Sequence, residues 1–325
     1  MKIEDINYIL PTRQIAEKNF DKEKWIKENP IDYYKFIYVL FVSSDVAPHV
    51  DKNLVMAIKF SAIYEVTRLY IPDTLYKFFS LNEDDVLNEK KFETLRNKKI
   101  YMANAREFND PFDGKAFFYD HKELSGIKQL KEHDGKLIDD FTSWHRETAL
   151  TKNDTSSMPM WAHYANNHKG YCVAYDMNDA TNIVLKGCTF PIQYTEERLD
   201  ITTYIKNYAE KISAEVDRQI KLGVKEVLFD DFSLIFIEQY LSNIKHLSWQ
   251  YENEFRCSIG EKDNQEPYIN ANPKAIYIGI NCSNEHKTKL IEIANSLSIP
   301  IYEMRINNFS EKFSLEEHLV GETYD

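Results

Sequence analysis

The stretch that decides the fold is "MWAHYANNHKGYCVAYD", from Met160 to Asp176. Its first ten residues, Met160 to Lys169, predict a short helix, because Ser157 can cap its start and Pro159 is tolerated in a first turn. Gly170, at the C′ position, is predicted to end that helix. The run "YCVAYD" then predicts the strand that follows.

The segments on either side extend this mixture of helices and strands. Thr74 to Ala105 predict a strand, a helix and a second strand, and Ala275 to Ile306 predict a strand–helix–strand unit with Ser283 as its N-cap. Ile201 to His246 are periodic and charged, which predicts two helices broken near Gly223. We therefore predict an α+β fold, with a mixed curved sheet and surrounding helices.

Residues 1–72 predict a helical N-terminal segment that precedes this sheet. Apolar residues recur at helical spacing between Ile15 and Ile26, and Pro72 disfavours helix at the residue before it. We predict two domains, a helical segment at 1–72 and an α+β domain at 73–325. The first is either a packing appendage or a module whose helices bind a partner.

Composition narrows the class of protein. The 325 residues are 43% hydrophobic and carry a formal net charge of −12, which opposes non-specific binding to nucleic acid. The four cysteines are scattered without a CxxC pair, which argues against a zinc ribbon and indicates reduced thiols. The start lacks the pattern of a signal peptide, and the most apolar run is too short to span a bilayer. We expect a soluble cytoplasmic protein without a membrane partner.

A second stretch, "WQYENEFR" from Trp249 to Arg256, is typical of a strand. Its period of two places Glu252, Glu254 and Arg256 on one face and the aromatic residues mainly on the other. Two like charges at this spacing raise each other's pKa unless a cation lies between them, and Arg256 is suitably placed. The alternative is the solvated face of a half-buried sheet.

In the first stretch, helical spacing aligns Trp161, Tyr164 and His168, while His163 falls on another side. This aromatic stripe is either a wall on which a base or nicotinamide stacks, or part of the core. The two histidines face different ways, and no HExxH sequence occurs, so we expect no metal site.

A third stretch, "FNDPFDG", carries Asn109 and Asp110 next to a proline. It is either a tight turn or a loop that clamps a ligand. The chain has no GxGxxG, Walker-type or GxSxG motif, so dinucleotide-binding Rossmann, P-loop and serine-hydrolase interpretations lose their main support.

Four stretches in this order, "LYKFFSL", "IYMANAREFNDPFDG", "MWAHYANNHKGYCVAYD" and "WQYENEFR", resemble the bacterial family called domain of unknown function 2971. The resemblance covers roughly Leu75 to Ile306. The helical segment before it lies outside the usual extent of that family.

The layout also resembles the ADP-ribosyltransferase superfamily. That resemblance implies an early residue that grips ribose or phosphate (Tyr76 or Lys77), an aromatic residue that stacks on nicotinamide (Tyr164), and a catalytic glutamate (Glu252 or Glu254). It implies NAD as the substrate and no metal.

These observations lead to three hypotheses. The first is an NAD-consuming ADP-ribosyltransferase-like enzyme, acting as a toxin-like effector in bacterial anti-phage defence on a protein or nucleic-acid target. The second is a metal-dependent nuclease-like enzyme, and the third is a non-enzymatic sensor module that binds a nucleotide-like small molecule or a peptide. The catalytic candidates are Glu252, Glu254 and Tyr164, and the ligand-binding candidates are Tyr76, Lys77, Asn109, Asp110, Trp161, His163, His168 and Arg256.

Overall fold

The computed structural model describes residues 20–42, 52–104, 107–108, 110–127, 145–226, 233–260 and 266–321. The chain divides into two compact units, each built from three stretches of sequence. The helical unit contains Met1–Tyr70, Asn104–Arg146 and Ile192–Trp249, and the sheet unit contains Ile71–Ala103, Glu147–Pro191 and Gln250–Asp325. The division after Tyr70 falls near the boundary predicted at residue 72, but the helical unit also takes in two later stretches.

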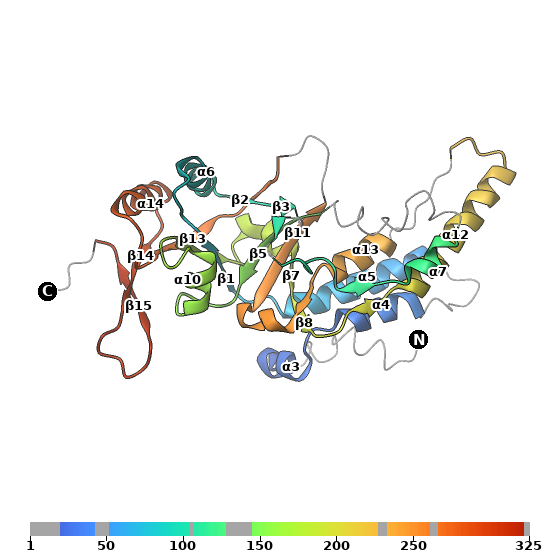
Figure 1. The fold of residues 1–325 in the computed structure, drawn as a ribbon, viewed down its shortest axis with the longest axis horizontal. Helices are drawn as coiled ribbons and strands as arrows, with labels where there is room; N and C mark the ends of the chain where they lie inside the picture. Colours follow the sequence, from blue (N-terminus) through green and yellow to red (C-terminus); the bar gives the residue numbers. More distant parts are fainter. Residues whose placement is uncertain are drawn as a thin grey trace. The chain divides into compact units, whose positions relative to one another are not determined.

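The sheet unit is organised around a mixed sheet (Figure 1), which has nine strands within the described residues. Eight follow the order β15-β14-β13-β6-β1-β5-β11-β7, and β3 pairs with β5. The β13–β14 pair is parallel, whereas β1 pairs antiparallel with both β5 and β6. The strands of this sheet are β1 (Thr74–Phe79), β3 (Ala103–Asn104), β5 (His145–Thr151), β6 (Tyr171–Asp176), β7 (Thr189–Pro191), β11 (Glu254–Gly260), β13 (Pro273–Ile278), β14 (Ile301–Ile306) and β15 (Leu315–Leu319).

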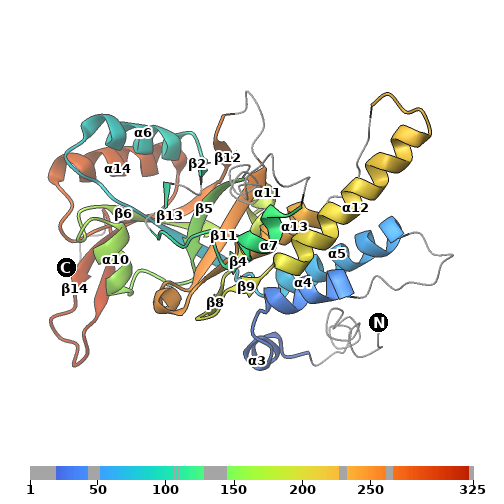
Figure 2. The ribbon, with the colours of Figure 1, turned by 45° about the vertical axis from the view of Figure 1, so that its right-hand side comes forward.

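Helices cover both faces of this sheet, as Figure 2 shows. On one face lie α6 and α14, which pack against each other; α10 lies on the other face. Apart from the two longer helices α6 and α14, the remaining elements of this unit are short. The helices and small strands are α6 (Asp85–Arg96), β2 (Lys99–Tyr101), α10 (Met158–Tyr164), η3 (Ala180–Asn182), α11 (Ile183–Gly187), η4 (Leu247–Glu252), β12 (Tyr268–Asn270) and α14 (Asn284–Leu297).

The alternation of side chains along the central strands explains the two layers. Along β6, Tyr171 and Val173 enter the apolar cluster that contains α6 and α14, whereas Cys172 enters the cluster beneath α10. All six residues of β1 pair with β6, from Thr74–Asp176 to Phe79–Tyr171, so the two strands share their faces. A strand buried on both faces needs apolar residues at odd and even positions alike, which "YCVAYD" supplies.

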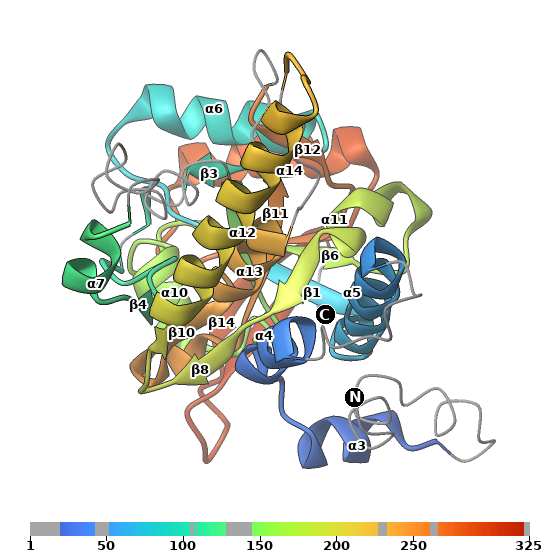
Figure 3. The same ribbon diagram turned by 90° about the vertical axis from the view of Figure 1, so that its right-hand side faces the viewer.

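The helical unit has an apolar core of its own, in which α4 packs against α5 and α13. Figure 3 shows these three helices. Tyr33 of α4 stacks on Tyr240 of α13, with ring centroids 5.7 Å apart. The break predicted near Gly223 is confirmed, because this glycine has a φ of +74° and follows α12. The elements are α3 (Lys22–Glu28), α4 (Tyr33–Val42), α5 (Lys52–Leu69), β4 (Phe117–Phe118), α7 (His121–Ser125), β8 (Gln193–Thr195), β9 (Leu199–Asp200), α12 (Thr202–Lys221), α13 (Ser233–Leu241) and β10 (Ile244–His246).

The fold class is α+β, as the sequence predicts. The strand–helix–strand unit near the C-terminus is confirmed as β13, α14 and β14, and the Ser283 side chain accepts a hydrogen bond from the His286 amide at the start of α14. None of the helices in the described ranges has the length and apolar character needed to cross a membrane.

The predicted extent of the first helix is wrong. α10 ends at Tyr164, and Asn166, Asn167 and His168 follow with φ of 48°, 53° and 66°. Gly170 therefore does not cap a helix. It is required because the chain approaches Phe79 so closely that a Cβ at this position would lie 1.9 Å from the Phe79 carbonyl oxygen.

The predicted strand from Trp249 to Arg256 is also wrong in its first half. Residues up to Glu252 form the 3₁₀-helix η4, Asn253 has a φ of 46°, and β11 begins at Glu254. A single period of two therefore does not relate Glu252 to Glu254. The turn at Asn253 separates the two carboxylates into different elements.

The close approach at Gly170 generates a first prediction. Gly170→Ala should lower the free energy of unfolding by about 3 kcal/mol or more, because overpacking against fixed backbone is costly. Urea unfolding followed by circular dichroism measures this. The control is Gly260→Ala, where no atom lies within 4 Å of the added Cβ. Equal stability of the two variants would contradict the assigned role of Gly170.

Candidate functional site

The first part of the candidate site is the turn that presents Glu252. Its side chain is buried, and the residue is only 3% exposed. The end of β5 fixes the backbone: Thr151 Oγ1 donates to the Glu252 carbonyl oxygen at 2.5 Å, and Asn153 Nδ2 donates to the Tyr251 carbonyl oxygen at 2.7 Å. Asn253 Nδ2 in turn donates to Asn153 Oδ1 at 2.8 Å. The turn is therefore held by side chains from a neighbouring strand.

The structure brings Tyr164 and Glu252 together, although 88 positions separate them in sequence. The Tyr164 hydroxyl, from the last residue of α10, donates a hydrogen bond to Glu252 Oε1. Burial raises the pKa of Tyr164 above its ordinary value, and the hydrogen bond and the negative charge of Glu252 raise it further. Glu254 acts in the same direction. The phenol therefore keeps its proton and serves as the donor.

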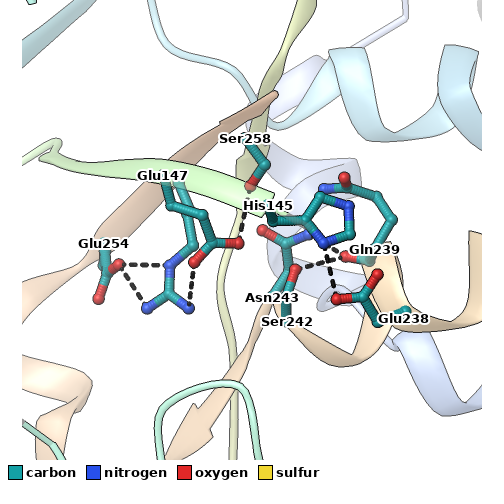
Figure 4. Close-up of polar contacts among 9 residues, drawn as sticks. His145, Glu147, Glu238, Gln239, Ser242, Asn243, Glu254 and Ser258 are labelled. Carbon is teal, nitrogen blue, oxygen red and sulfur yellow. Dashed lines mark hydrogen bonds and ion pairs between the residues drawn. The ribbon is translucent and has the colours of Figure 1, made fainter. Parts of the chain in front are cut away.

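Glu254 belongs to a second buried group, which surrounds the guanidinium of Arg256. Figure 4 shows the Glu254, Glu147 and Ser258 side chains of this group. Arg256 Nη2 lies 2.9 Å and Nε 3.0 Å from Glu254 Oε1, and Nη1 lies 3.5 Å from Glu147 Oε2. Ser258 Oγ donates to Glu147 Oε1 at 3.0 Å. The expectation that Arg256 lies between Glu252 and Glu254 is wrong, because the guanidinium lies between Glu254 and Glu147.

Both groups lie on the face of the sheet that α10 covers. Phe255 and Cys257 enter the cluster on the α6 and α14 side, so the alternate residues Glu254 and Arg256 face the other way. On β5, Thr151 pairs with Tyr76, which packs against the cluster beneath α10. Two buried ion pairs and a partly buried tyrosine–glutamate hydrogen bond are thus assembled on one face.

The two early candidates on β1 face in opposite directions. Tyr76 lies on the α10 face, half-buried, with its ring 6.3 Å from that of Tyr277. Lys77 points to the other face, and its Nζ donates to the Ala149 carbonyl oxygen at 3.0 Å. Burial lowers the pKa of Lys77 to about 8, although the Glu254 charge acts against this shift.

The aromatic stripe of α10 divides into a buried and an exposed part. Trp161 is fully buried, donates from Nε1 to the Thr155 carbonyl oxygen at 2.8 Å, and stacks on His168 with centroids 5.9 Å apart. Burial lowers the pKa of His168. His163 is exposed, with its ring 6.0 Å from that of Tyr251. The contacts of Trp161 are those of a core residue.

The loop with "FNDPFDG" lies in the helical unit, and Asn109 lies outside the described residues. Asp110 is buried and forms a turn: its Oδ1 accepts from the Phe112 amide at 2.9 Å, and its carbonyl oxygen accepts from the Asp113 amide at 3.1 Å. These contacts correspond to the tight-turn alternative.

The helical unit carries another buried polar pair, also drawn in Figure 4. His145 Nδ1 lies 2.6 Å from Glu238 Oε1, and both side chains are 8% exposed. Burial raises the pKa of Glu238, although the hydrogen bond to His145 lowers it. Across the described residues, no cluster of three or more His, Cys, Asp or Glu side chains is arranged to hold a metal ion.

Sequence reasoning missed Glu147 and Ser258. The available signal was the composition of β5, "HRETALT", because an acid within an otherwise strand-like run requires a buried partner if the strand is central. Only the pairing of strands could identify that partner as Arg256.

The chain is thus an α+β protein with a partly buried tyrosine–glutamate pair beside its sheet and a buried glutamate–arginine–glutamate group within the sheet. The family model described as "Protein of unknown function (DUF2971)" matches residues 160–257, which include Tyr164, Glu252, Glu254 and Arg256. Searches of curated proteins and of solved structures found no match.

The tyrosine–glutamate pair generates a second prediction. Tyr164→Phe should lower the free energy of unfolding by about 1–3 kcal/mol, because it removes a donor from a buried carboxylate. Chemical denaturation at pH 7 measures the change. The control, Tyr268→Phe, removes a hydroxyl from a half-buried ring that packs on Tyr101 in the same unit. A Tyr164→Phe protein as stable as this control would show that the hydrogen bond contributes nothing.

Lys77 generates a third prediction. Its pKa is about 8 in the folded protein against 10.5 ordinarily, so between these values the unfolded chain binds more protons. The free energy of unfolding should therefore rise with pH across this window relative to Lys77→Met. Unfolding at several pH values, with Lys90→Met of α6 as an exposed control, tests the slope. Parallel curves for wild type and Lys77→Met would contradict it.

Proposed function

We propose that the chain is an NAD-consuming, ADP-ribosyltransferase-like enzyme in which Glu252 and Tyr164 form the catalytic pair. The observation that carries this proposal is the hydrogen bond from the Tyr164 hydroxyl to the buried Glu252 carboxylate. The pair joins an aromatic residue from a helix to a glutamate that lies two positions before the start of a sheet strand. These are two of the three residue types that the resemblance to ADP-ribosyltransferases implies.

The chemistry of NAD cleavage suits such a pair. When the bond between ribose C1′ and the nicotinamide nitrogen breaks, its electrons leave with nicotinamide and positive charge develops on the ribose. A fixed carboxylate nearby stabilises that charge, and it does so more strongly where water is excluded. Glu252 is buried and its turn is fixed by Thr151 and Asn153. The protein around it therefore needs little rearrangement when the positive charge develops on the ribose.

The other candidates take supporting roles in this proposal. The Tyr164 ring is the surface on which nicotinamide stacks, and its hydroxyl orients Glu252. Tyr76, on the same face of the sheet, is favoured over Lys77 as the early residue that contacts ribose or phosphate. Arg256 holds Glu254 within the sheet, which makes Glu254 a structural neighbour of the pair. Water or a nucleophile on a macromolecule then bonds to C1′ and loses a proton.

The proposal predicts that Glu252→Gln reduces NAD turnover by about 10²-fold or more, in line with the loss of one preorganised charge-stabilising group. Glutamine keeps the shape and can still accept from Tyr164, so folding should be retained. The measurement is release of nicotinamide by purified protein, with Glu292→Gln on α14 as a charge-matched exposed control.

Glu254→Gln is the weaker test, because it removes charge from the buried Arg256 pair and thereby also destabilises the sheet. If the proposal extends to a toxin-like role in defence, expression of wild type should slow bacterial growth and Glu252→Gln should relieve the effect. Turnover by Glu252→Gln equal to wild type would overturn the catalytic assignment. Nucleotide binding without turnover by wild type would instead identify a sensor module.

A further inference from the structure

A row of tyrosines crosses the α10 face of the sheet and includes Tyr76, which the proposed NAD site also uses. Tyr302 of β14 pairs in register with Tyr277 of β13, and their rings stack with centroids 5.2 Å apart at an interplanar angle of 14°. The ring of Tyr76 lies 6.3 Å from that of Tyr277. We call these three residues the tyrosine row.

The row is partly open to solvent. Tyr277, in the middle, is 8% exposed, whereas Tyr76 and Tyr302 at the two ends are half-buried. Trp161 of α10 packs on Phe78, further along β1. The row therefore joins the core at Tyr277 and presents ring surface at its ends.

Two exposed carboxylates border the row. On β15, Glu317 pairs with Met304, which packs in the cluster beneath α10, so the Glu317 side chain leaves on the same face. Thr155 Oγ1 donates a hydrogen bond to Glu317 Oε1, which directs this carboxylate toward the loop before α10. That loop carries Asp154, which is also exposed.

Both carboxylates are electrostatically coupled to the rings. Burial is the main cause that raises the pKa of Tyr76, and the negative charges of Asp154 and Glu317 raise it further. Glu317 also raises the pKa of Tyr277. In the part of the chain that the structure describes, neither Asp154 nor Glu317 has a salt-bridge partner.

We propose that the tyrosine row, bordered by Asp154 and Glu317, is a docking site for an arginine side chain of a protein partner. A guanidinium fits both features, because its planar face stacks on aromatic rings while its N–H groups donate to carboxylates. Lysine would satisfy the carboxylates but stacks less well. The net charge of −12 favours approach of a basic partner in general, and the row supplies the specific contact. The inference goes beyond the proposed NAD chemistry and shares only Tyr76 with it, so its test changes Tyr302 and Glu317, to which the NAD proposal gives no role.

The experiment measures binding of a fluorescent seven-residue peptide of alternating glycine and arginine by anisotropy, without NAD. We expect saturable binding that Tyr302→Leu and Glu317→Gln each weaken about threefold or more, the scale of an exposed cation–π or ion-pair contact. Tyr302→Phe keeps the ring and should keep the affinity. Glu292→Gln removes the same charge as Glu317→Gln from the far side of the sheet and should also leave the affinity unchanged.

Any of three outcomes would overturn the site. The first is the absence of saturable binding, and the second is the same loss of affinity in Glu317→Gln and Glu292→Gln. The third is a glycine–lysine peptide that binds as tightly as the glycine–arginine peptide and whose binding Tyr302→Leu does not affect. Thermal melts of each variant separate loss of the site from loss of the fold. Glu317→Gln changes an exposed side chain and keeps a hydrogen-bond acceptor for Thr155, so this variant should fold. It therefore still tests the proposal if Tyr302→Leu does not fold.

Discussion

The buried charge of Arg256 is the constraint on which the sheet unit depends. An arginine that is 1% exposed is tolerated only when carboxylates surround it with good geometry, because removing a guanidinium from water is costly. Glu254 lies on its own strand and Glu147 on the neighbouring β5, so neutralising this charge requires β5 and β11 to lie side by side. The charge therefore fixes which strands meet toward the β7 end of the sheet, where apolar packing alone would specify the pairing less strictly.

Once β5 lies beside β11, the geometry of the tyrosine–glutamate pair follows. The end of β5 supplies Thr151 and Asn153, whose side chains hold the turn before β11. That turn presents Glu252 to α10, while Glu254 enters the sheet. Two glutamates that the sequence places two residues apart thus acquire different environments. One is bonded to a phenol and the other to a guanidinium, and such a division is a common way to give two acids different roles.

Much of the fold could be predicted because its information is local. The strand–helix–strand unit, the two helices around Gly223 and the strand after Gly170 all follow from periodicity and capping residues. The arrangement of the candidate site was harder to predict from the sequence. The alternation in "WQYENEFR" predicts a strand where the chain forms the 3₁₀-helix η4. The left-handed residue that follows η4, Asn253, is held by Asn153, a hundred positions away in sequence. Glu147 could not be linked to Arg256 without the strand order, and Trp161 could not be recognised as core without knowing which face of α10 meets Phe78.

The early end of α10 is what allows Tyr164 to reach Glu252. Only residues 165–170 connect Tyr164 to the start of β6, and three of them in succession adopt left-handed backbone, an arrangement that costs roughly 1–2 kcal/mol per residue for most side chains. Asparagine, at two of the three positions, tolerates it best. Backbone hydrogen bonds offset the cost of this left-handed backbone. The Asn281 amide donates to the His168 carbonyl oxygen at 3.0 Å, and the Gly279 amide donates to the Gly170 carbonyl oxygen at 2.9 Å. Had the helix continued to Lys169, the chain could not turn into β6 at Gly170. The strained connection thus allows α10 to end at Tyr164, which positions the tyrosine hydroxyl beside Glu252.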